Sequence, residues 1–307
     1  GGATTLSGLT DVAIDATNFV NSFLIQTNSD GSAPTTGTLS SASNNIGIGN
    51  DVFKVLTSGT DNVGVGQSTL QDLTTGTHNI CLGQKAGQNI TDGIRNMLIG
   101  QYAGNGIIGD QSSQEGQYNV AMGYASGYSI TTGTNNICMG SQAGRNTSPS
   151  GAITTADYQI CLGDDSITDL FCADTTISSS DKRDKTDIEN FTTGLDWVEQ
   201  MQPVTYSWDN RSRYLTNEDD DLNNVTRDGS KKSTKKHIGF LAQDVEIIEK
   251  QFGYSNSRDD MLTVSLTSDG KRYGLKYERI VPILVNAIKE LSTEVNTLKT
   301  KVTALES

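Results

Sequence analysis

Lysine and arginine are scarce in the first part of this 307-residue sequence. Residues 1–180 hold only 4 basic residues against 14 acidic ones, whereas residues 181–307 hold 19 basic and 22 acidic, within a formal net charge of −13. Binding to nucleic acid depends on Lys and Arg displacing counterions from phosphates, so this balance argues against a nucleic-acid-binding protein. The one basic run, at residues 231–236, lies close to the acidic residues 218–221 and is interpreted as a solvated loop.

Patterns of metal-binding and membrane-spanning proteins are also missing. The four cysteines have neither Cys-x-x-Cys spacing nor neighbouring histidines, so neither a metal site nor a cofactor is predicted. Three of them, Cys81, Cys138 and Cys161, occupy one repeat position, which indicates small buried side chains. No apolar run approaches the length of a membrane span. The opening residues Gly1–Thr4 do not resemble a secretory start, and we expect the natural chain to begin upstream of Gly1.

A repeat of 17 residues dominates the first part of the chain. Its core is an Asn, three mostly apolar residues and a Gly, and successive copies begin 17, 17, 17, 23, 17 and 23 residues apart. The two longer steps indicate six-residue insertions into a constant unit, and such a fixed period is the signature of a stacked architecture. Six copies begin with Asn and the last begins with Gln: Asn45, Asn62, Asn79, Asn96, Asn119, Asn136 and Gln159.

Each copy predicts one short strand of a stacked coil. Side chains alternate along a strand, so the first and third apolar positions share one face and the small middle residue lies on the other. The recurrent Asn predicts a ladder of side-chain amides along the stack. Glycines would allow the positive-φ corners of a tight coil. An aliphatic residue also recurs six positions before four of the Asn residues, at Leu56, Leu73, Ile90 and Ile130.

Over residues 44–163 the repeat resembles those of the β-roll heads of trimeric autotransporter adhesins and of phage tail-fibre shafts. The resemblance implies a repetitive, trimeric β architecture. A monomeric β-solenoid is the alternative, but each coil has so little aliphatic bulk that a lone coil would be poorly buried. The insertions, near 105–118 and 145–158, are expected to bulge from one side of the stack, where binding loops commonly lie.

A different kind of sequence begins near residue 180, where charge density rises and after which both tryptophans occur. Five segments follow in order: SDKRDK at Ser180–Lys185, GLDWV at Gly194–Val198, PVTYSW at Pro203–Trp208, HIGFLAQDV at His237–Val245 and YGLKY at Tyr273–Tyr277. This series resembles the intramolecular chaperone domain of phage endosialidases and tail fibres, the peptidase family S74, over residues 180–307. The resemblance implies an α+β module that assembles a trimer.

The same resemblance implies a self-cleaving site. In that family a serine and a lysine five residues later drive cleavage just before the serine, which maps onto Ser180 and Lys185 with the scissile bond between Ser179 and Ser180. The Ser180 hydroxyl can attack the carbonyl of its own preceding peptide bond if a base takes its proton. Lys185 serves as that base only where burial lowers its pKa, which would make cleavage conditional on folding and trimer packing. His237 and Gln243 are predicted to support the site or the core.

The end of the chain predicts a long helix. Its apolar residues are separated by alternating steps of four and three, a heptad seam that predicts a coiled coil between copies of the chain. The mixture of Leu, Ile and Val leaves the number of strands open, and three follows from the resemblance. The seam comprises Leu284, Ile288, Leu291, Val295, Leu298, Val302 and Leu305.

The sequence thus predicts a mainly β chain in four parts. These are an N-terminal segment (1–43), a trimeric stacked β-repeat fibre of β-roll or β-helix type (44–163), a linker (164–179), and an α+β chaperone and protease domain (180–307) whose residues 280–307 form a trimeric coiled coil. The predicted protein is a homotrimeric virion tail fibre or spike that attaches to a host receptor, either glycan or protein. Its only expected enzymatic activity is a single self-cleavage, without cofactor, metal, nucleic-acid or membrane partner.

Three different functions also fit parts of the sequence. A glycan-degrading tailspike enzyme would need a pair of placed carboxylates, for which Asp164 with Asp165 and Asp110 with Glu115 are candidates. Acidic residues in solvated turns are the commoner explanation of such pairs. A cellular trimeric adhesin is the second possibility. The third is a transcription-factor precursor with the same C-terminal module, which the acidic first half of the chain disfavours.

Overall fold

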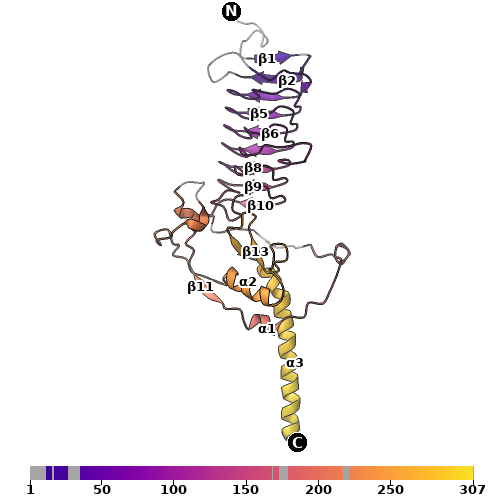
Figure 1. Cartoon of the computed structure of the whole chain (residues 1–307), viewed down its shortest axis with the longest axis vertical. Coiled ribbons are helices and arrows are strands. Elements are labelled where there is room, and N and C mark those ends of the chain that lie inside the picture. Colours follow the sequence, from indigo (N-terminus) through magenta and orange to yellow (C-terminus); the bar gives the residue numbers. More distant parts are fainter. Residues whose placement is uncertain are drawn as a thin grey trace, which may run out of the picture. The chain divides into compact units, whose positions relative to one another are not determined.

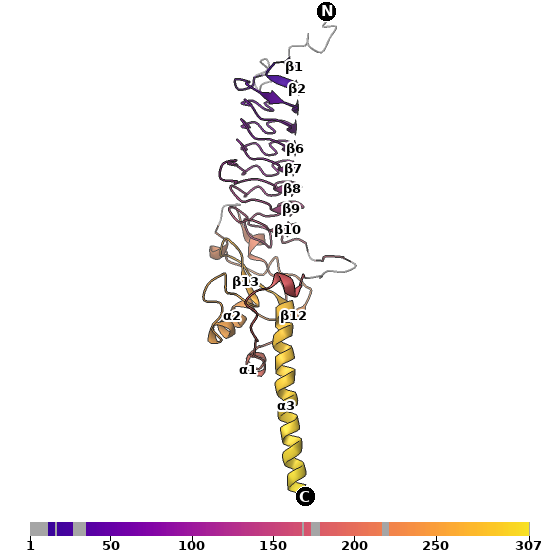
Figure 2. The same cartoon turned by 90° about the vertical axis from the view of Figure 1, so that its right-hand side faces the viewer.

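The computed structural model describes residues 12–15, 17–26, 35–167, 169–172, 179–216 and 221–306. The chain divides into two compact units. The first comprises Gly1–Thr168 together with Asn210–Arg227, and the second comprises Asp169–Asp209 together with Asp228–Ser307. Figures 1 and 2 show short strands stacked in the first unit and the helices α1, α2 and α3 in the second.

The first unit is built on one sheet of short strands, to which each copy of the repeat contributes one strand. β1 (Val12–Asp15) pairs antiparallel with β2 (Phe19–Ile25), and every later pairing in this sheet is parallel. β3 (Ala42–Ser43) pairs with β2 beside the main path. The path continues through β4 (Ile46–Ile48), β5 (Val63–Val65), β6 (Ile80–Leu82), β7 (Met97–Ile99), β8 (Val120–Met122), β9 (Ile137–Met139) and β10 (Ile160–Leu162). The predicted stack of coils with mainly β structure is confirmed.

Equivalent residues of successive repeats lie opposite one another in this sheet. Cys81 pairs with Gly64 on one side and Leu98 on the other, so the register follows the sequence period. The middle residue of each strand points into the coil, and there it meets a column of fully buried aliphatic residues: Leu56, Leu73, Ile90, Ile107, Ile130 and Ile153. This column contains the four positions predicted from the sequence and two more.

Phe53 fills the coils whose middle strand residue is glycine. A Cβ atom added at Gly47 would lie 2.7 Å from the Phe53 ring, and one added at Gly64 would lie 3.3 Å from it. The larger middle residues of later strands, such as Cys81 and Leu98, occupy this space themselves. A large side chain at Phe53 therefore compensates for glycine at the strand position, so the interior of the coil stays closely packed.

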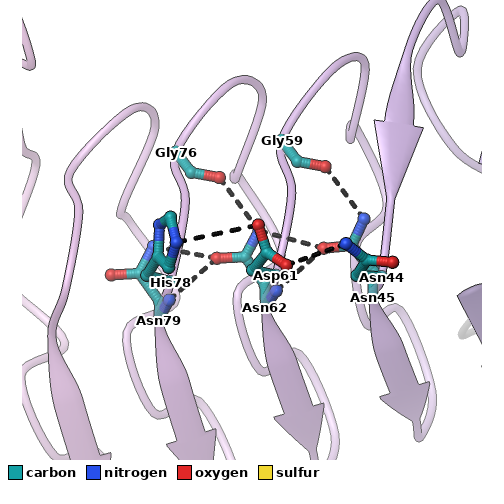
Figure 3. A network of polar contacts seen from close by, with 8 residues as sticks. All are labelled: Asn44, Asn45, Gly59, Asp61, Asn62, Gly76, His78 and Asn79. Atoms are coloured by element: carbon teal, nitrogen blue, oxygen red, sulfur yellow. Dashed lines mark hydrogen bonds and ion pairs between the residues drawn. The ribbon is translucent and has the colours of Figure 1, made fainter.

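The asparagine ladder predicted from the sequence is present and buried. The Nδ2 of Asn62 donates to the Oδ1 of Asn45 (3.0 Å) and to the carbonyl oxygen of Gly76 (2.9 Å), and Asn79 repeats this pattern on Asn62 (Figure 3). Each Oδ1 also accepts the backbone N–H of the next Asn. The pattern continues through Asn96, Asn119 and Asn136 and ends where the backbone N–H of Gln159 donates to Asn136. The side chain of Ser22 accepts from the Asn45 N–H at the other end.

Corners of the coil use positive φ at more positions than the sequence predicts. Gly83 is required at its corner, because its φ is +126° and a Cβ atom would lie 2.7 Å from the backbone of Gly100. The residue before each ladder position also has positive φ, between 56° and 61°, although none is glycine. This corner column comprises Asn44, Asp61, His78, Arg95, Tyr118, Asn135 and Tyr158.

The two insertions leave the coil at different corners, contrary to the expectation that both bulge from one side. Ile107 and Ile153 occupy the same place in the buried aliphatic column. The first insertion follows Ile107 and contains a turn closed by paired backbone hydrogen bonds between Asp110 and Glu115. The second precedes Ile153 and contains turns in which Ser148 bonds back to Arg145.

The second unit has a mixed core around Trp197. Trp197 lies in α1 (Leu195–Val198), is fully buried, and stacks on Phe252 with ring centroids 4.9 Å apart. β11 (Val204–Tyr206) pairs antiparallel with β12 (His237–Gly239), and β13 (Val264–Leu266) with β14 (Tyr273–Leu275). The helices are α2 (Ala242–Gln251) and α3 (Ile280–Glu306), and the short turns are η2 (Lys182–Asp184) and η5 (Tyr277–Arg279).

The segment Asn210–Arg227 belongs to the first unit, although it lies within the sequence assigned to the second domain. It contains η3 (Arg211–Tyr214) and η4 (Leu222–Asn224). The hydroxyl of Ser212 donates to the carboxylate of Asp165, and the guanidinium of Arg213 donates to the Asp165 carbonyl oxygen at 3.1 Å. The chain therefore returns to the end of the repeat region after it has entered the domain that begins near residue 180.

Among the described residues, only the first part of α3 packs against other parts of the chain. Ile280, Ile283 and Ala287 are buried, and Glu290 accepts a 2.7 Å hydrogen bond from the backbone N–H of Leu195 in α1. Every residue from 291 to 306 is exposed, the predicted heptad seam included. In the part of the chain that the structure describes, no helix is both long and apolar enough to cross a membrane.

Candidate active site

Ser180 and Lys185 lie at the two ends of one short turn. The turn is η2, and Asp181 caps it by accepting the backbone N–H of Arg183 at 2.9 Å and its guanidinium at 2.6 Å. Lys185 follows the turn, and its Nζ lies 2.6 Å from the Oγ of Ser180. The two predicted catalytic groups are therefore in direct contact, and the five-residue spacing is spanned by a single capped turn.

The distance between the two groups suits a nucleophile and its base, but both residues lie at the surface of the chain. A charged lysine donates this hydrogen bond, whereas a neutral amine would accept the hydroxyl proton. Both Ser180 and Lys185 are exposed in the single chain. The desolvation that would favour a neutral amine is therefore not supplied by the described residues of one chain.

His237 and Gln243 do not join this pair in the described contacts. His237 lies in β12 opposite Tyr206 of β11, and the two rings stack with centroids 5.6 Å apart. Trp208 stands against both rings, at 5.3 Å from Tyr206 and 6.4 Å from His237. Gln243 lies exposed in the first turn of α2. The geometry gives His237 a packing role between two aromatic side chains.

The sequence interpretation missed the buried carboxylate of Glu249, which accepts several hydrogen bonds in the second unit. Its oxygens accept the hydroxyl hydrogen bonds of Ser255 and Thr263 and the backbone N–H groups of Leu262 (3.2 Å), Thr263 (2.5 Å) and Val264 (3.1 Å). Burial alone would raise the pKa of Glu249, but these hydrogen bonds outweigh it and hold the pKa below its ordinary value. Glu249 thereby ties α2 to the segment that enters β13.

A sequence signal for Glu249 does exist. Val245 and Ile248 mark the inward face of α2 at helical spacing, and Glu249 falls on that face, one turn after Val245. A charged residue in an apolar stripe indicates a buried group with fixed partners, because an unpaired buried charge is very costly.

Of the carboxylates considered for glycan hydrolysis, Asp110 and Asp164 cap turns. The Asp110 side chain accepts the hydroxyl of Ser112 at 2.6 Å and its N–H at 2.8 Å, and these bonds, with those of Ser113, lower the Asp110 pKa to about 2. Asp164 accepts the N–H of Ser166 at 2.9 Å, and Asp165 holds Ser212. The contacts of Asp110 and Asp164 are those that short acidic side chains commonly make in turns, whereas Asp165 joins a segment 47 residues away. Among the described residues, no group of three or more His, Cys, Asp or Glu side chains is placed to hold a metal ion.

Comparison with protein families identifies the segment that begins at Ser180. Residues 180–254 match the model of the family Peptidase S74, described as the chaperone of endosialidase, and the match begins at Ser180. The chain carries an S74-family chaperone domain. Membership of this family implies self-cleaving peptidase activity in general, and such domains are typical of phage tail-fibre and tailspike proteins. The comparison with curated proteins found no match, and neither did that with solved structures.

Proposed function

We propose that the chain is a homotrimeric tail-fibre or spike protein of a virion, assembled by its S74-family domain and cut by that domain between Ser179 and Ser180. The observation that carries the proposal is the 2.6 Å contact between Lys185 Nζ and Ser180 Oγ, at the first residue of the family match. The assembled fibre would attach the virion to a receptor on the host surface.

Two apolar surfaces support assembly of several chains. The seam of α3 from Leu291 to Leu305 is exposed in the single chain. A helix with such a stripe gains stability by packing the stripe against copies of itself. The outward residues of the sheet, among them Ile46, Met97 and Ile160, form a second exposed apolar row along the stack. Large apolar surfaces of this kind mark sites of association.

Assembly would also switch on the chemistry. Packing of subunits around η2 would remove water from Lys185 and leave its amine neutral, so that it takes the Ser180 hydroxyl proton. The Ser180 Oγ then attacks the Ser179 carbonyl carbon. The C–N bond breaks as the lysine returns its proton to the Ser180 nitrogen. Water hydrolyses the resulting ester, which leaves a carboxylate on Ser179 and a free amine on Ser180.

The repeat explains why such a fibre needs a temporary assembly device. Successive coils present nearly the same strand every 17 residues, so chains could associate one coil out of step. A coiled coil at the other end of each chain would fix the common register before the stacks pack. Removal of the device by cleavage then makes the product kinetically stable, because the route of assembly is no longer available in reverse.

The cleavage is tested by intact mass under denaturing conditions. We compare the wild-type chain of 32.8 kDa with Ser180→Ala, Lys185→Gln and, as a matched control in the same turn, Lys182→Gln. The wild type and the control should each release a C-terminal piece of about 14 kDa by residue share, which begins at Ser180. Both site variants should remain whole. A trimeric wild type that stays uncut, or a cut Ser180→Ala chain, contradicts the proposed site.

The link between assembly and cleavage needs its own pair of variants. Leu291→Asp with Leu298→Asp places two charges in the seam, whereas Thr293→Asp with Thr300→Asp places the same two charges on the opposite face of α3. The seam variant should be monomeric by light scattering and uncut by mass, and the control should be trimeric and cut. A trimeric seam variant would exclude the coiled coil as the assembly device. A monomer that cuts itself would exclude the coupling.

A further inference from the structure

Three outward columns of side chains follow the strands along the stack, and equivalent positions of successive repeats define them. The first column is the residue directly after the strand glycine in the five repeats from Gly66 to Gly140: Gln67, Gln84, Gln101, Tyr124 and Ser141. The second is the next residue along the chain: Ser68, Lys85, Tyr102, Ala125 and Gln142. The third lies three residues further on: Gln71, Gln88, Asn105, Tyr128 and Arg145.

Two of these columns begin as ladders of amides, exposed in the first column and partly buried in the third. In the first column, Gln101 donates to Gln84 at 2.6 Å and Gln84 donates to Gln67 at 2.7 Å. In the third column, Gln88 donates to Gln71 at 3.1 Å and Asn105 donates to Gln88 at 3.2 Å. Each amide is therefore held in one orientation by its neighbour, one coil away.

Each of the three columns then contains one tyrosine, and the three tyrosines come from two successive repeats. Tyr102 meets Tyr124 edge-on, with ring centroids 6.3 Å apart, and meets Tyr128 in the same way at 6.4 Å. We name this group the tyrosine shelf (Tyr102, Tyr124 and Tyr128). Tyr124 and Tyr128 keep 47% and 36% of their surface exposed.

Cations hold two rings of the shelf in place. The Nζ of Lys85 lies 5.7 Å from the centre of the Tyr102 ring, and the guanidinium of Arg145 lies 4.6 Å from the centre of the Tyr128 ring. Each cation comes from the neighbouring position of the same column. Ring orientation is thus fixed by contacts within the coil surface itself, before any ligand arrives.

The stack does not need these rings for its own stability. Other coils place Gln, Ser, Lys or Ala at the same three positions, and the buried column inside the coil is unchanged there. Three partly exposed aromatic side chains that gather on one surface, with their orientation fixed, therefore indicate a binding surface.

We propose that the tyrosine shelf and the amides that border it bind an oligosaccharide chain, an inference that rests on the proposed role in host attachment. The apolar C–H faces of sugar rings pack on exposed aromatic faces, while sugar hydroxyls exchange hydrogen bonds with side-chain amides such as those of Gln84 and Gln101. Neighbouring rungs are ~4.8 Å apart, as in any sheet, which is comparable with the length of one sugar ring along a glycan.

Charge on this surface also fits a saccharide, neutral or acidic. From Gln67 to Arg145 the three columns contain no carboxylate, although the chain as a whole carries a net charge of −13. Lys85 and Arg145 supply positive charge at the two ends of the shelf. Polar side chains interrupt the rings on both sides, so the continuous apolar centre typical of a stable protein interface is lacking.

The test replaces all three rings by residues that the chain already uses. Tyr102→Gln, Tyr124→Gln and Tyr128→Gln copy Gln142, Gln101 and Gln88 of the same columns, so the coil should be undisturbed. A matched control, Tyr118→Asn with Tyr158→Asn, removes two exposed tyrosines of the corner column, where Asn44 and Asn135 occur naturally. Each full-length protein is applied to a printed array of neutral and acidic oligosaccharides, while its oligomeric state and cleavage are measured in parallel.

We expect the wild type and the control to bind the same subset of the array. The triple variant should lose at least about tenfold in affinity, because three ring contacts are removed together. A trimeric, cut wild type that binds no oligosaccharide, or a triple variant that binds as the wild type does, overturns the inference and leaves the proposed function standing. A triple variant that no longer forms the trimer also overturns it, because the rings would then lie in a subunit interface. A wild type that neither trimerises nor cuts itself refutes the proposed function instead, whatever the array shows.

Discussion

Substitution of Asn79 by alanine tests how much the buried amide ladder contributes to the stack. Asn79 is fully buried in the middle of the ladder and uses all of its side-chain hydrogen-bonding groups. Its Nδ2 donates to Asn62 Oδ1 (3.0 Å) and to the Gly93 carbonyl (2.8 Å). Its Oδ1 accepts the backbone N–H and the Nδ2 of Asn96, both at 3.1 Å.

The magnitude follows from what each partner keeps after the substitution. Asn62 Oδ1 still accepts the backbone N–H of residue 79, and the Nδ2 of Asn96 still donates to Gly116 at 3.0 Å. The Gly93 carbonyl and the Asn96 backbone N–H lose the hydrogen bonds that the Asn79 side chain provides. A buried polar group left without its partner costs ~1–3 kcal/mol, so two such groups give a loss of about 2–6 kcal/mol. Against a typical unfolding free energy of ~5–15 kcal/mol this is a large fraction.

The assay is guanidinium unfolding followed by circular dichroism, after a check that unfolding is reversible. The matched control is His78→Asn, which changes the neighbouring exposed residue to one that occupies the same corner position in two other coils, Asn44 and Asn135. The control should stay within about 0.5 kcal/mol of the wild type. If Asn79→Ala shifts the unfolding free energy no more than His78→Asn does, the ladder contributes little and the reasoning from orphaned groups is wrong.

Two further predictions concern buried ionisable groups. Glu249→Gln should cost about 3 kcal/mol at pH 7, read from tryptophan fluorescence in urea, because hydrogen bonds to a charged acceptor are lost. The pKa of Glu249 is held below its ordinary 4.5, so the charged side chain stabilises the fold above that pH, and this stabilisation is lost as the pH falls through the folded-state pKa. If the destabilisation caused by Glu249→Gln does not shrink on acidification, this account is wrong. Burial raises the pKa of Cys81, and burial with Cys161 nearby raises the pKa of Cys138 to about 12. Iodoacetamide at pH 8 should therefore label the exposed Cys172 alone in the native chain and all four cysteines in denaturant. Native labelling of Cys81 or Cys138 would show that the coils open.

The stack of strands could be predicted because the sequence that forms it repeats at a constant interval. One copy of the repeat leaves a short strand ambiguous, but a constant step of 17 residues places Asn45, Asn62 and Asn79 above one another whatever the details of the coil. The corner column escaped prediction for a local reason. Positive φ is expected for Gly and Asn, whereas His78 and Arg95 adopt it because the hydrogen bonds of the coils above and below fix the backbone there.

The candidate site likewise combines features that neighbouring residues determine with features that distant contacts determine. The capped turn from Ser180 to Lys185 is encoded within six residues, since Asp181 fixes the turn and the turn brings the amine to the hydroxyl. The environment of Lys185 depends on whatever packs around that turn, and in the single chain it is solvent. Contacts between distant segments, such as Ser212 with Asp165 and Glu249 with Thr263, likewise leave little trace in the sequence. The local geometry can therefore form early, whereas the proposed self-cleavage also requires a desolvation of Lys185 that the described residues of one chain do not supply.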